Sequence, residues 1–514
     1  MIDDAVVLLT FPDHETEKNG KTFTVSDGLV SEISYAELAD AQCFYVCLEF
    51  KSVASEIVSR GHRLPSLVVD LEELIVAASR AQKVSEIRSS IRFENLLRRF
   101  GAVDDDVERF QALNCNSLTF DEDLLLRIGG AILRAFKVIA RLASIRQEWT
   151  RYIDIEAPVA IALYSDIMAG VPFDPDTLSM FRNEIEYDFF KALKNFSAKH
   201  DLPLEVPTSK DLEVILEGLG FDLENASVEF VLDFISMENG LGEDVQNLRR
   251  LRATRDALNG ISHKKSTSYP QIDAQGTRTS RVLLKVPAIQ NIPKKYREIL
   301  VPRPGRAFSY VDYDQFEVGI MAALSGDPIL LELYNQEDLH EAVSKSLFAT
   351  EGMRKQAKRL FLSYAYGMRR KNLIDAAVNL GSSKEIAKST FDQFVVFEAW
   401  KVDLAKRLAE DRRIGTRNGN YFHLQHKYAP TAKDIRSAVS QKVQGTGSLV
   451  FKMALLKLAK LDGFRIVLPM HDAVLVEHGL GDDPCTVVEL FEGAMTDLFD
   501  GKIAGKASVS EFAV

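Results

Sequence analysis

Apolar residues follow different patterns in different parts of the chain. Short apolar runs typical of strands, VVLLTF, CFYVCLEF and PSLVVDL, occur in the first part of the sequence. A helical spacing of apolar positions follows in LLLRIGGAILRAFKVIARLASIRQEW. Because strands have a two-residue side-chain period and helices a period of about 3.6 residues, this succession predicts a mixed α/β domain over residues 1–154.

After residue 155 the pattern is helical for about a hundred residues. The polar segment HKKSTSYPQIDAQGTRTSR interrupts it, and the strand candidate AFSYVDYDQFEVG comes next. Helical spacing resumes from Pro328 to about Arg413, the turn NGNYF follows, and a long helix is predicted from Thr431 to Leu461. The strand candidates FRIVLP and AVLVE lie near the C-terminus. Sheet elements separated by long helical stretches predict a sheet-floored domain that carries helical subdomains.

Length and composition indicate a folded protein with more than one domain. The chain has 514 residues, of which 46% are hydrophobic and 27% charged. No apolar run is long enough to span a bilayer, and the N-terminus begins with acidic residues. We therefore expect a cytoplasmic protein without membrane association. Its four scattered cysteines are expected to be reduced thiols: Cys43, Cys47, Cys115 and Cys485.

The net charge of −11, taken alone, argues against a nucleic-acid-binding protein. The basic residues are nevertheless clustered, and total charge does not set the field inside a cleft. The segment RKQAKRLFLSYAYGMRRK, residues 354–371, has seven Lys or Arg and no acid. A second cluster comprises Arg249, Arg250, Arg252, Arg255, Lys264 and Lys265. Each run by itself is also consistent with a solvated helix face.

The segment SYVDYDQFEV, residues 309–318, combines a strand pattern with carboxylates. Alternation along a strand puts Asp312 and Asp314 on one side, and Gln315 and Glu317 on the other. An aspartate at the end of a strand can also serve only to cap the next helix, and Asp-Gln-Phe-Glu resembles a capping sequence. Both interpretations stay open for this segment alone.

The segment MHDAVLVE places His471 and Asp472 between two apolar runs. A carboxylate is costly to bury unless it is paired or binds a cation. The pair could instead form the tip of a hairpin, with Asp472 bonded to its own backbone. If Asp312 and Asp472 converge, two Mg²⁺ ions roughly 3.5–4 Å apart would relieve their repulsion and assist phosphoryl transfer. Mg²⁺ prefers a few carboxylates together with substrate phosphates, which suits this donor set.

Arg354, Lys358, Leu362 and Tyr366 recur every four residues. On a helix this spacing makes one slowly drifting stripe of two cations, an apolar residue and an aromatic residue. Two cations one turn apart can hold a polyphosphate, and the next two turns offer surface for a base. Gly367 would end the helix or let a strand approach. An ordinary amphipathic surface helix is the alternative.

Taken together and in this order, these segments resemble the motifs of the family A DNA polymerases, the DNA polymerase I family. VDYDQFEVGIMAALSGDP is similar to motif A, RKQAKRLFLSYAYGM to motif B and LPMHDAVLVE to motif C. TSRVLLKVPAIQNIP resembles the TGR…LQNIP segment, and RSAVSQKVQGTG resembles the R…PVQGTAAD helix. Asp338-Leu-His340 stands where the family has D-I-H. The resemblance extends from about residue 155 to the end, and five ordered motifs make it highly specific.

The resemblance implies a template-directed DNA polymerase that extends a primer 3′-hydroxyl with dNTPs and releases pyrophosphate. Two Mg²⁺ ions, for which Mn²⁺ can substitute, would be held by Asp312, Asp472 and the Tyr313 carbonyl. The implied dNTP-binding residues are Gln315, Glu317, His340, Arg354, Lys358, Leu362 and Tyr366. The implied DNA-binding residues are Arg281, Gln290, Asn291, Arg436, Gln444 and His471.

The family also implies particular roles for some of these residues. Arg354, Lys358 and His340 would hold the triphosphate. Glu317 would be the steric gate that excludes a ribose 2′-hydroxyl. Arg281 would read minor-groove acceptors together with Gln444, and all correct base pairs share those acceptors. Catalysis would consist of positioning and charge stabilisation rather than covalent chemistry.

Four positions depart from the family pattern. Leu362 stands where Phe or Tyr is usual, which changes the stacking surface for the incoming nucleotide. Ala473 replaces a Glu beside the catalytic Asp and so removes an auxiliary carboxylate. Ser440 and Gly319 replace Asn and Arg. None of these changes removes a group that the core chemistry needs.

In this family the region ahead of the polymerase domain is often a 3′–5′ exonuclease, which needs about four carboxylates. Asp13 and Glu15 in VVLLTFPDHETEKNG resemble its first motif. EFKSVASEIVSRG has no Asp where the second motif needs one, and the last motif is not matched around Asp121 and Asp123. We predict a degenerate exonuclease-like domain over residues 1–154, without exonuclease activity and with Asp13 and Glu15 as relics. A weak active nuclease and a domain for structure or partner binding are the alternatives.

The predicted fold is therefore an α+β multidomain, right-hand polymerase with an exonuclease-like α/β domain ahead of a polymerase domain over 155–514. The palm would comprise 155–180, 276–330 and 431–514, the thumb 181–275 and the fingers 331–430. We expect a monomer that binds primer-template DNA, with or without other replication proteins, in a bacterial or phage-infected cell. The compact length favours a phage or mobile-element enzyme.

Two other classes of protein are consistent with parts of the pattern. A single-subunit RNA polymerase shares the fold and the paired Asp, but Glu317 argues against it because that enzyme must admit the 2′-hydroxyl. A non-catalytic DNA-binding relative would keep the basic clusters but lose an Asp or the Lys of motif B. Asp312, Asp472, Arg354 and Lys358 are all present here.

Overall fold

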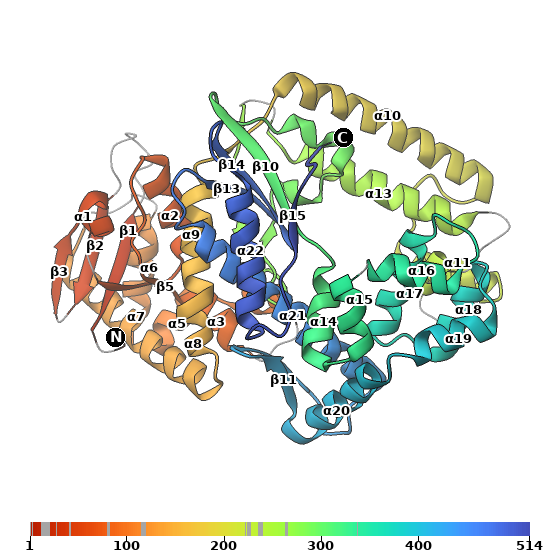
Figure 1. The fold of residues 1–514 in the computed structure, drawn as a ribbon. Coiled ribbons are helices and arrows are strands. Elements are labelled where there is room, and N and C mark those ends of the chain that lie inside the picture. Colours follow the sequence, from red (N-terminus) through yellow and green to blue (C-terminus); the bar gives the residue numbers. More distant parts are fainter. Residues whose placement is uncertain are drawn as a thin grey trace.

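The structure is a computed structural model of the chain. It describes residues 2, 4–11, 21–26, 28–40, 43–79, 83–114, 120–221, 223, 228–234, 240–262, 266–336 and 338–513. Asp13, Glu15, Cys115, Lys264 and Lys265 lie outside the described residues. An N-terminal α/β domain lies beside a larger domain with a central sheet and helices on either side (Figure 1). Within the described ranges, none of the helices combines the length and the apolar character needed to cross a membrane.

A five-stranded mixed sheet, ordered β3-β2-β1-β4-β5, is the centre of the N-terminal domain. Its strands are β1 (Ala5–Phe11), β2 (Lys21–Ser26), β3 (Leu29–Glu32), β4 (Phe44–Cys47) and β5 (Val68–Asp70). Its helices are α1 (Tyr35–Asp40), α2 (Phe50–Ser59), α3 (Leu71–Ala78), α4 (Val84–Ser90), α5 (Phe93–Arg99), α6 (Asp104–Asn114) and α7 (Glu122–Ile145). The buried stripe of α7, repeating every three to four residues, joins the apolar core of this sheet. The predicted α/β organisation of this region is confirmed.

The acidic residues of this domain that the structure describes near the predicted exonuclease motifs have local structural roles. Asp121 caps α7 and forms an ion pair with Arg109 at 2.6 Å. Asp123 is exposed in the first turn of the same helix. Asp70 is buried, caps α3 and accepts a hydrogen bond from the Phe50 amide at 2.7 Å. Capping and pairing explain Asp121 and Asp70, and the exposed Asp123 lies near the positive end of the α7 dipole.

Two long helices, α10 and α13, lie side by side at one edge of the molecule (Figure 1) and, with the shorter helices beside them, enclose a small apolar core of their own. They fall in the segment predicted as the thumb. The elements from Trp149 to Asn259 are α8 (Trp149–Arg151), η1 (Tyr152–Glu156), α9 (Ala157–Ile167), β6 (Val171–Pro172), α10 (Pro175–His200), α11 (Ser209–Gly218), α12 (Val228–Phe234) and α13 (Leu241–Asn259).

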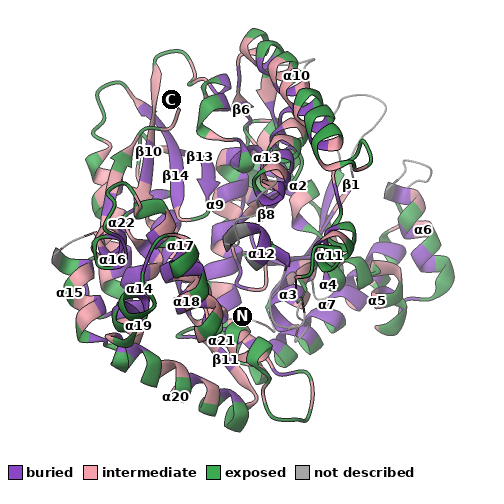
Figure 2. Ribbon diagram, turned by 90° about the vertical axis from the view of Figure 1, so that its right-hand side faces the viewer, coloured by how far each residue is buried: buried purple, intermediate pink, exposed green. Residues whose placement is uncertain are grey.

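The central sheet is antiparallel and has the order β13-β14-β10-β15. Its strands are β10 (Arg306–Tyr313), β13 (Arg465–Met470), β14 (Ala473–Gly479) and β15 (Ala507–Ser510). Helices α9 and α22 (Cys485–Leu498) pack against it, and the long helix α21 (Ala432–Leu458) packs against both of these helices. Between α13 and β10 the sequence forms β7 (Thr267–Ser268), β8 (Ile272–Asp273), β9 (Leu283–Leu284), η2 (Ile289–Asn291) and η3 (Lys294–Ile299). Figure 2 shows that the strands β13 and β14 are buried.

The strand predicted through Gly319 ends at Tyr313, and that part of the prediction is wrong. Gln315 has a left-handed backbone (φ 50°) that breaks the strand, and α14 (Phe316–Ser325) begins directly after it. The predicted alternation of Gln315 and Glu317 on a strand face is corrected accordingly. Glu317 instead lies in the first turn of α14.

In Figure 1 the helices predicted as the fingers lie to the right of the central sheet, below the helix pair α10 and α13. They are α15 (Pro328–Gln336), α16 (Leu339–Leu347), α17 (Arg354–Ala365), α18 (Arg370–Asn379), α19 (Lys384–Asp392) and α20 (Val395–Asp411). A hairpin of β11 (Arg413–Thr416) and β12 (Gly419–His423) connects α20 to α21. The predicted domain boundaries stay predictions.

Candidate active site

His471 and Asp472 form a two-residue turn between β13 and β14, because Met470 pairs with Ala473. His471 has a positive φ of 63°. A positive φ at the first turn residue belongs to the tight hairpins that match the twist of the strands, and glycine usually supplies it. A histidine in this conformation is strained, and such strain is most often found at functional sites. The hairpin interpretation of this segment is correct, and it does not exclude a functional one.

The sheet register brings the two predicted catalytic carboxylates to the same end of the sheet. Asp312 on β10 is the partner of Ala473 on β14, and Asp472 is the next residue along the turn. Burial, followed by the charges of Asp472 and Asp314, raises the pKa of Asp312 to about 7. Burial also raises the pKa of Asp472, and the Glu317 carboxylate acts in the same direction. The pair of aspartates therefore carries a repulsion that a cation would relieve.

This donor set fits a hard divalent cation. Within the described ranges, no three His, Cys, Asp or Glu side chains are grouped as a metal site. The protein thus offers two carboxylates, and main-chain, water and phosphate oxygens would complete the coordination. The Tyr313 side chain is already occupied: its hydroxyl donates to the Phe491 carbonyl at 2.7 Å and its ring stacks on Phe316 at 4.3 Å. Only the Tyr313 carbonyl is left as a ligand from that residue.

We expect Mg²⁺ binding at this site to tighten as the pH rises from 6 to 8. The pKa of Asp312 is raised to about 7, so a proton competes with the cation below that pH and leaves it free above. Isothermal titration calorimetry of the DNA-free protein in buffers of different ionisation enthalpy would measure the affinity and the protons released. Proton release should decline above pH 7 and be smaller in Asp312→Asn. Affinity independent of pH would contradict the expectation.

Helix α17 presents the predicted basic and aromatic stripe outward. Arg354 and Lys358 are exposed and Leu362 is half-buried, whereas Ala357 and Phe361 on the other side are fully buried. Tyr366 caps the helix, and Gly367 follows with a positive φ of 87°. The charge of Lys358 lowers the pKa of Asp312, so this end of the stripe acts electrostatically on the paired aspartates.

His340 lies in the first turn of α16 and is 3% exposed. Burial and then the charge of Lys358 lower its pKa to about 4. Its Nδ1 atom has no hydrogen-bonding partner among the described residues. At neutral pH it can therefore donate or accept a hydrogen bond but carries no charge. Arg354 is held at 2.5 Å from Asp338, the residue that caps the same helix.

Glu317, the predicted steric gate, forms an ion pair with Arg281 at 3.1 Å. Tyr366 lies beside it, and burial together with the Glu317 charge raises the pKa of that tyrosine. Gln444 accepts a hydrogen bond from the Ser440 hydroxyl at 3.1 Å, so the residue that replaces the family's Asn supports it. The residues implied to contact the nascent pair and the minor groove are thus neighbours.

Two predicted contact residues have structural partners inside the protein. The Gln315 side-chain oxygen accepts a hydrogen bond from the Leu339 amide at 2.8 Å, which ties the end of β10 to α16. Gln290 is buried, and its side-chain oxygen accepts from the Leu284 amide at 3.1 Å. Gln290 therefore supports the loop after Arg281, and its predicted contact with DNA stays a prediction.

The remaining predicted DNA-binding residues are accessible. Asn291, Arg436 and His471 are exposed. The Arg436 side chain runs past Gly367, where an added Cβ would lie 3.1 Å from the arginine Cγ. A side chain at position 367 would therefore disturb Arg436 as well as the end of α17.

Sequence reasoning missed two cations close to the paired aspartates. The Lys294 charge lowers the pKa of Asp312. The Arg297 guanidinium lies over the rings of Tyr310 and Phe512, at 5.7 and 5.4 Å, and its charge acts on His471. Both residues follow the QNIP segment, so their position after a recognised motif was the available signal.

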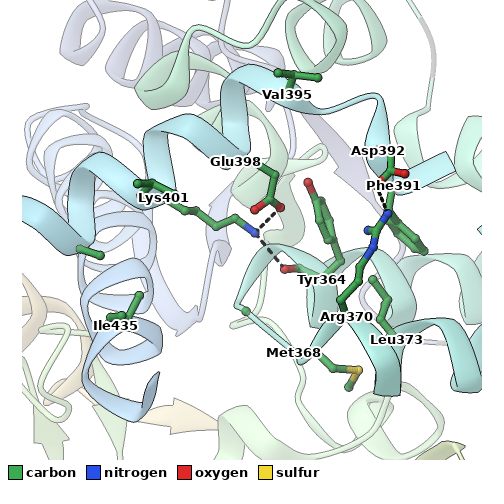
Figure 3. A pocket seen from close by; sticks show the side chains of 13 residues that line it. Tyr364, Met368, Arg370, Leu373, Phe391, Asp392, Val395, Glu398, Lys401 and Ile435 are labelled. Atoms are coloured by element: carbon green, nitrogen blue, oxygen red, sulfur yellow. Dashed lines mark hydrogen bonds and ion pairs between the residues drawn. The ribbon is translucent and has the colours of Figure 1, made fainter. Parts of the chain in front are cut away.

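A cavity of about 640 Å³ lies on the other side of α17 and contains none of the predicted substrate-binding residues. Figure 3 shows Tyr364 of α17 facing Lys401 and Glu398 of α20 across it. The Lys401 ammonium lies 4.4 Å from the tyrosine ring centroid and 2.7 Å from Glu398. Arg370 pairs with Asp392 at its rim. The cavity is thus a mainly apolar space between α17 and α20, and neither Asp312 nor Asp472 lines it.

Several DNA polymerases I are similar to this chain in sequence. DNA polymerase I of Caldicellulosiruptor bescii is 26% identical over 392 residues, which are 67% of this chain and 45% of that protein. DNA polymerase I of Bacillus subtilis is 24% identical over 401 residues, 68% of this chain and 43% of that protein. The chain therefore spans less than half the length of these curated relatives.

A solved structure of similar fold is the polymerase domain of Pol1 from M. smegmatis, in complex with DNA primer-template and dNTP. It superposes with a TM-score of 0.74 at 20% sequence identity and covers 98% of this chain and 94% of that one. The right-hand arrangement of palm, fingers and thumb fits this neighbour. The family model for DNA polymerase family A matches residues 225–500, more than half of the sequence. By this match, the chain belongs to DNA polymerase family A.

Proposed function

We propose that this chain is a template-directed DNA polymerase that adds dNTPs to a primer 3′-hydroxyl and releases pyrophosphate. One observation carries the proposal. Asp312 and Asp472 come to the same end of the central sheet, and Lys358 on the outward stripe of α17 is near enough for its charge to lower the pKa of Asp312. Paired carboxylates opposite a cationic helix face are what transfer of a nucleotidyl group requires.

Each side chain has a defined task in this proposal. Asp312 and Asp472 would hold divalent cations, with Mg²⁺ as the proposed ion. When bound, these ions would supply charge neutralisation for the attacking and leaving oxygens. Arg354 and Lys358 bind the triphosphate, and neutral His340 adds a hydrogen bond. Leu362 offers an apolar surface for the incoming base.

Primer extension is the direct test. A 5′-labelled primer on a longer template should be extended to full length with Mg²⁺ and four dNTPs, and not with four NTPs. Extension with NTPs at a comparable rate would favour the RNA-polymerase alternative. Binding of the duplex without extension by either set would favour a non-catalytic DNA-binding protein.

Replacing Glu317 by Ala should relax sugar selection. The carboxylate lies in the first turn of α14, is held by Arg281 and lies beside Tyr366, where the nucleotide sugar is expected. Its loss should lower the preference for dNTP over NTP on the order of 100-fold, measured as a ratio of kcat/KM values. Glu385→Ala, which removes an exposed acid from α19, is the control. Unchanged selectivity in Glu317→Ala would contradict the gate assignment.

Several finer features belong to this proposal. The palm, thumb and fingers boundaries, a monomeric state and association with other replication proteins are expectations. So are a bacterial or phage-infected cell as the location and a phage or mobile-element origin. Loss of exonuclease activity stays a prediction, because Asp13 and Glu15 lie outside the described residues.

A further inference from the structure

A buried group of polar side chains lies directly behind the segment that carries Arg281. The Lys452 ammonium of α21 is 2.5 Å from the Glu156 carboxylate and 2.8 Å from the Ser280 hydroxyl. The Ser280 hydroxyl in turn donates to Glu156 at 2.8 Å. These three residues are 1%, 3% and 5% exposed. None of them is needed for the proposed chemistry, so their burial calls for a separate explanation.

From Glu156 onward the buried ion pairs form a row in which acidic and basic side chains alternate. Arg151 bonds Glu156 at 2.8 Å and Glu148 at 2.8 Å, and both are buried. Glu148 then accepts a hydrogen bond from the backbone amide of Asn420, in β12 of the β11–β12 hairpin, at 2.8 Å. Two acids and two bases alternate from this hairpin to Ser280, so the buried charges balance. This row of ion pairs connects the start of α8, η1 and α21 into one rigid support.

Ser280 has a backbone conformation that this support must maintain. Its φ of 61° is in the left-handed region, which a residue other than glycine adopts only at a cost. Its carbonyl accepts a hydrogen bond from the Ser448 hydroxyl at 2.5 Å. The hydroxyl and the carbonyl of Ser280 are therefore both held by residues of α21 or η1. Such conformations persist where the surroundings over-determine them.

Arg281 follows Ser280 directly, so the clamped turn sets the direction in which Arg281 leaves the backbone. Its guanidinium ends beside Glu317, and its charge acts on Asp472 and His471. A long side chain amplifies a small rotation of its backbone, and a misplacement of about 1 Å can cost on the order of 100-fold in rate.

We propose that Ser280, clamped by Glu156 and Lys452, is a positioning residue that aims Arg281 at the minor groove of the primer terminus. This inference rests on the proposed polymerase function and assigns a task to residues that the function itself does not use. Ser280 touches no substrate; it acts through Arg281.

The test removes the Ser280 hydroxyl and, separately, the acceptor that Arg281 would read. Ser280→Ala is combined with a primer whose terminal guanine is replaced by 3-deazaguanine, which lacks the N3 acceptor in the minor groove. Each change alone should lower kcat/KM for the next dNTP about tenfold. Together they should cost no more than either alone, because the contact is already lost. Arg281→Ala should show the same lack of additivity.

Two further variants separate the positioning role from a general effect on folding. Ser280→Gly relieves the strained φ, so it should fold with an unchanged melting temperature and show the same lack of additivity as Ser280→Ala. Thr446→Ala removes another buried hydroxyl from α21, one that donates to the Lys442 carbonyl at 2.6 Å. This control should leave the penalty for 3-deazaguanine at its full size.

The positioning role would be overturned if the loss in kcat/KM caused by 3-deazaguanine multiplied with the loss caused by each Ser280 variant. It would also be overturned if the Ser280 variants had wild-type kinetics. If the wild-type protein fails to extend even the unmodified primer, the proposed function itself is wrong. If the wild type extends normally and the penalties multiply, only this inference fails.

Discussion

Asp472→Asn should abolish primer extension while leaving the protein folded. The substitution keeps the size and shape of the side chain but removes the negative charge that faces Asp312 at the end of the sheet. A neutral amide is a poor ligand for a hard divalent cation. Because charge stabilisation carries most of the barrier reduction in such transfers, we expect kcat to fall by about 10³-fold or more.

Single-turnover extension of a labelled primer with Mg²⁺ and dNTPs would measure this loss. Asp482→Asn is the matched control, because Asp482 lies just beyond the other end of β14, is exposed and accepts the Gly479 amide at 2.7 Å. It should extend like the parent. A thermal melt would establish that Asp472→Asn is folded, and extension at the parental rate by this variant would refute the assignment of the aspartates.

The elements that the sequence predicts well are those fixed by local spacing. The four-residue recurrence of Arg354, Lys358 and Leu362 required a helix, and α17 begins at Arg354 and turns those residues outward. His471 and Asp472 lie between two apolar runs of opposite strands, and the hairpin places them at the tip. Here a short window of sequence contains all the forces that decide the structure.

The end of β10 was beyond such reasoning because a distant segment decides it. SYVDYDQFEV alternates well enough for a longer strand. Gln315 nevertheless takes a left-handed backbone, and its side chain bonds the Leu339 amide, 24 residues later in the sequence. Tertiary contact thus overrides the local pattern. The neutral state of His340 has a similar origin, since it depends on burial and on the nearby charges of α17.

Lys452 was missed for the same reason. In LVFKMALL a single lysine among apolar residues suggests a side chain that bends toward the surface. The structure instead buries it against Glu156, which is 296 residues away in the sequence. Burial of the pair lowers the pKa of Lys452, with desolvation as the main cause and Glu156 opposing it. No local pattern distinguishes these two outcomes.

Lys452→Met should destabilise the fold strongly. The thioether side chain fills the space, but Glu156 loses its cation while it stays buried. The chain of Glu148, Arg151 and Glu156 then carries an uncompensated negative charge in a region of low dielectric. Breaking a buried pair in this way typically costs about 3–5 kcal/mol.

Charge balance can be restored by also removing the negative charge of Glu156. Glu156→Gln removes the negative charge and keeps an oxygen for Ser280, so Lys452→Met combined with Glu156→Gln leaves one acid and one base in the chain. We expect this double variant to be more stable than Lys452→Met alone by at least about 1 kcal/mol, as a coupled pair should be. Urea unfolding of the two single variants, the double variant and the parent would give the coupling free energy.

Lys457→Met provides the comparison for a surface pair on the same helix. Lys457 lies 2.7 Å from Asp497, but the two side chains are 38% and 62% exposed. Water screens such pairs, so this variant should lose less than about 1 kcal/mol. If Lys452→Met is no more destabilising than Lys457→Met, the buried lysine is not compensating Glu156. If the double variant shows no recovery, the charges behind Ser280 act independently, and the alternating chain would not be the unit that holds the turn before Arg281.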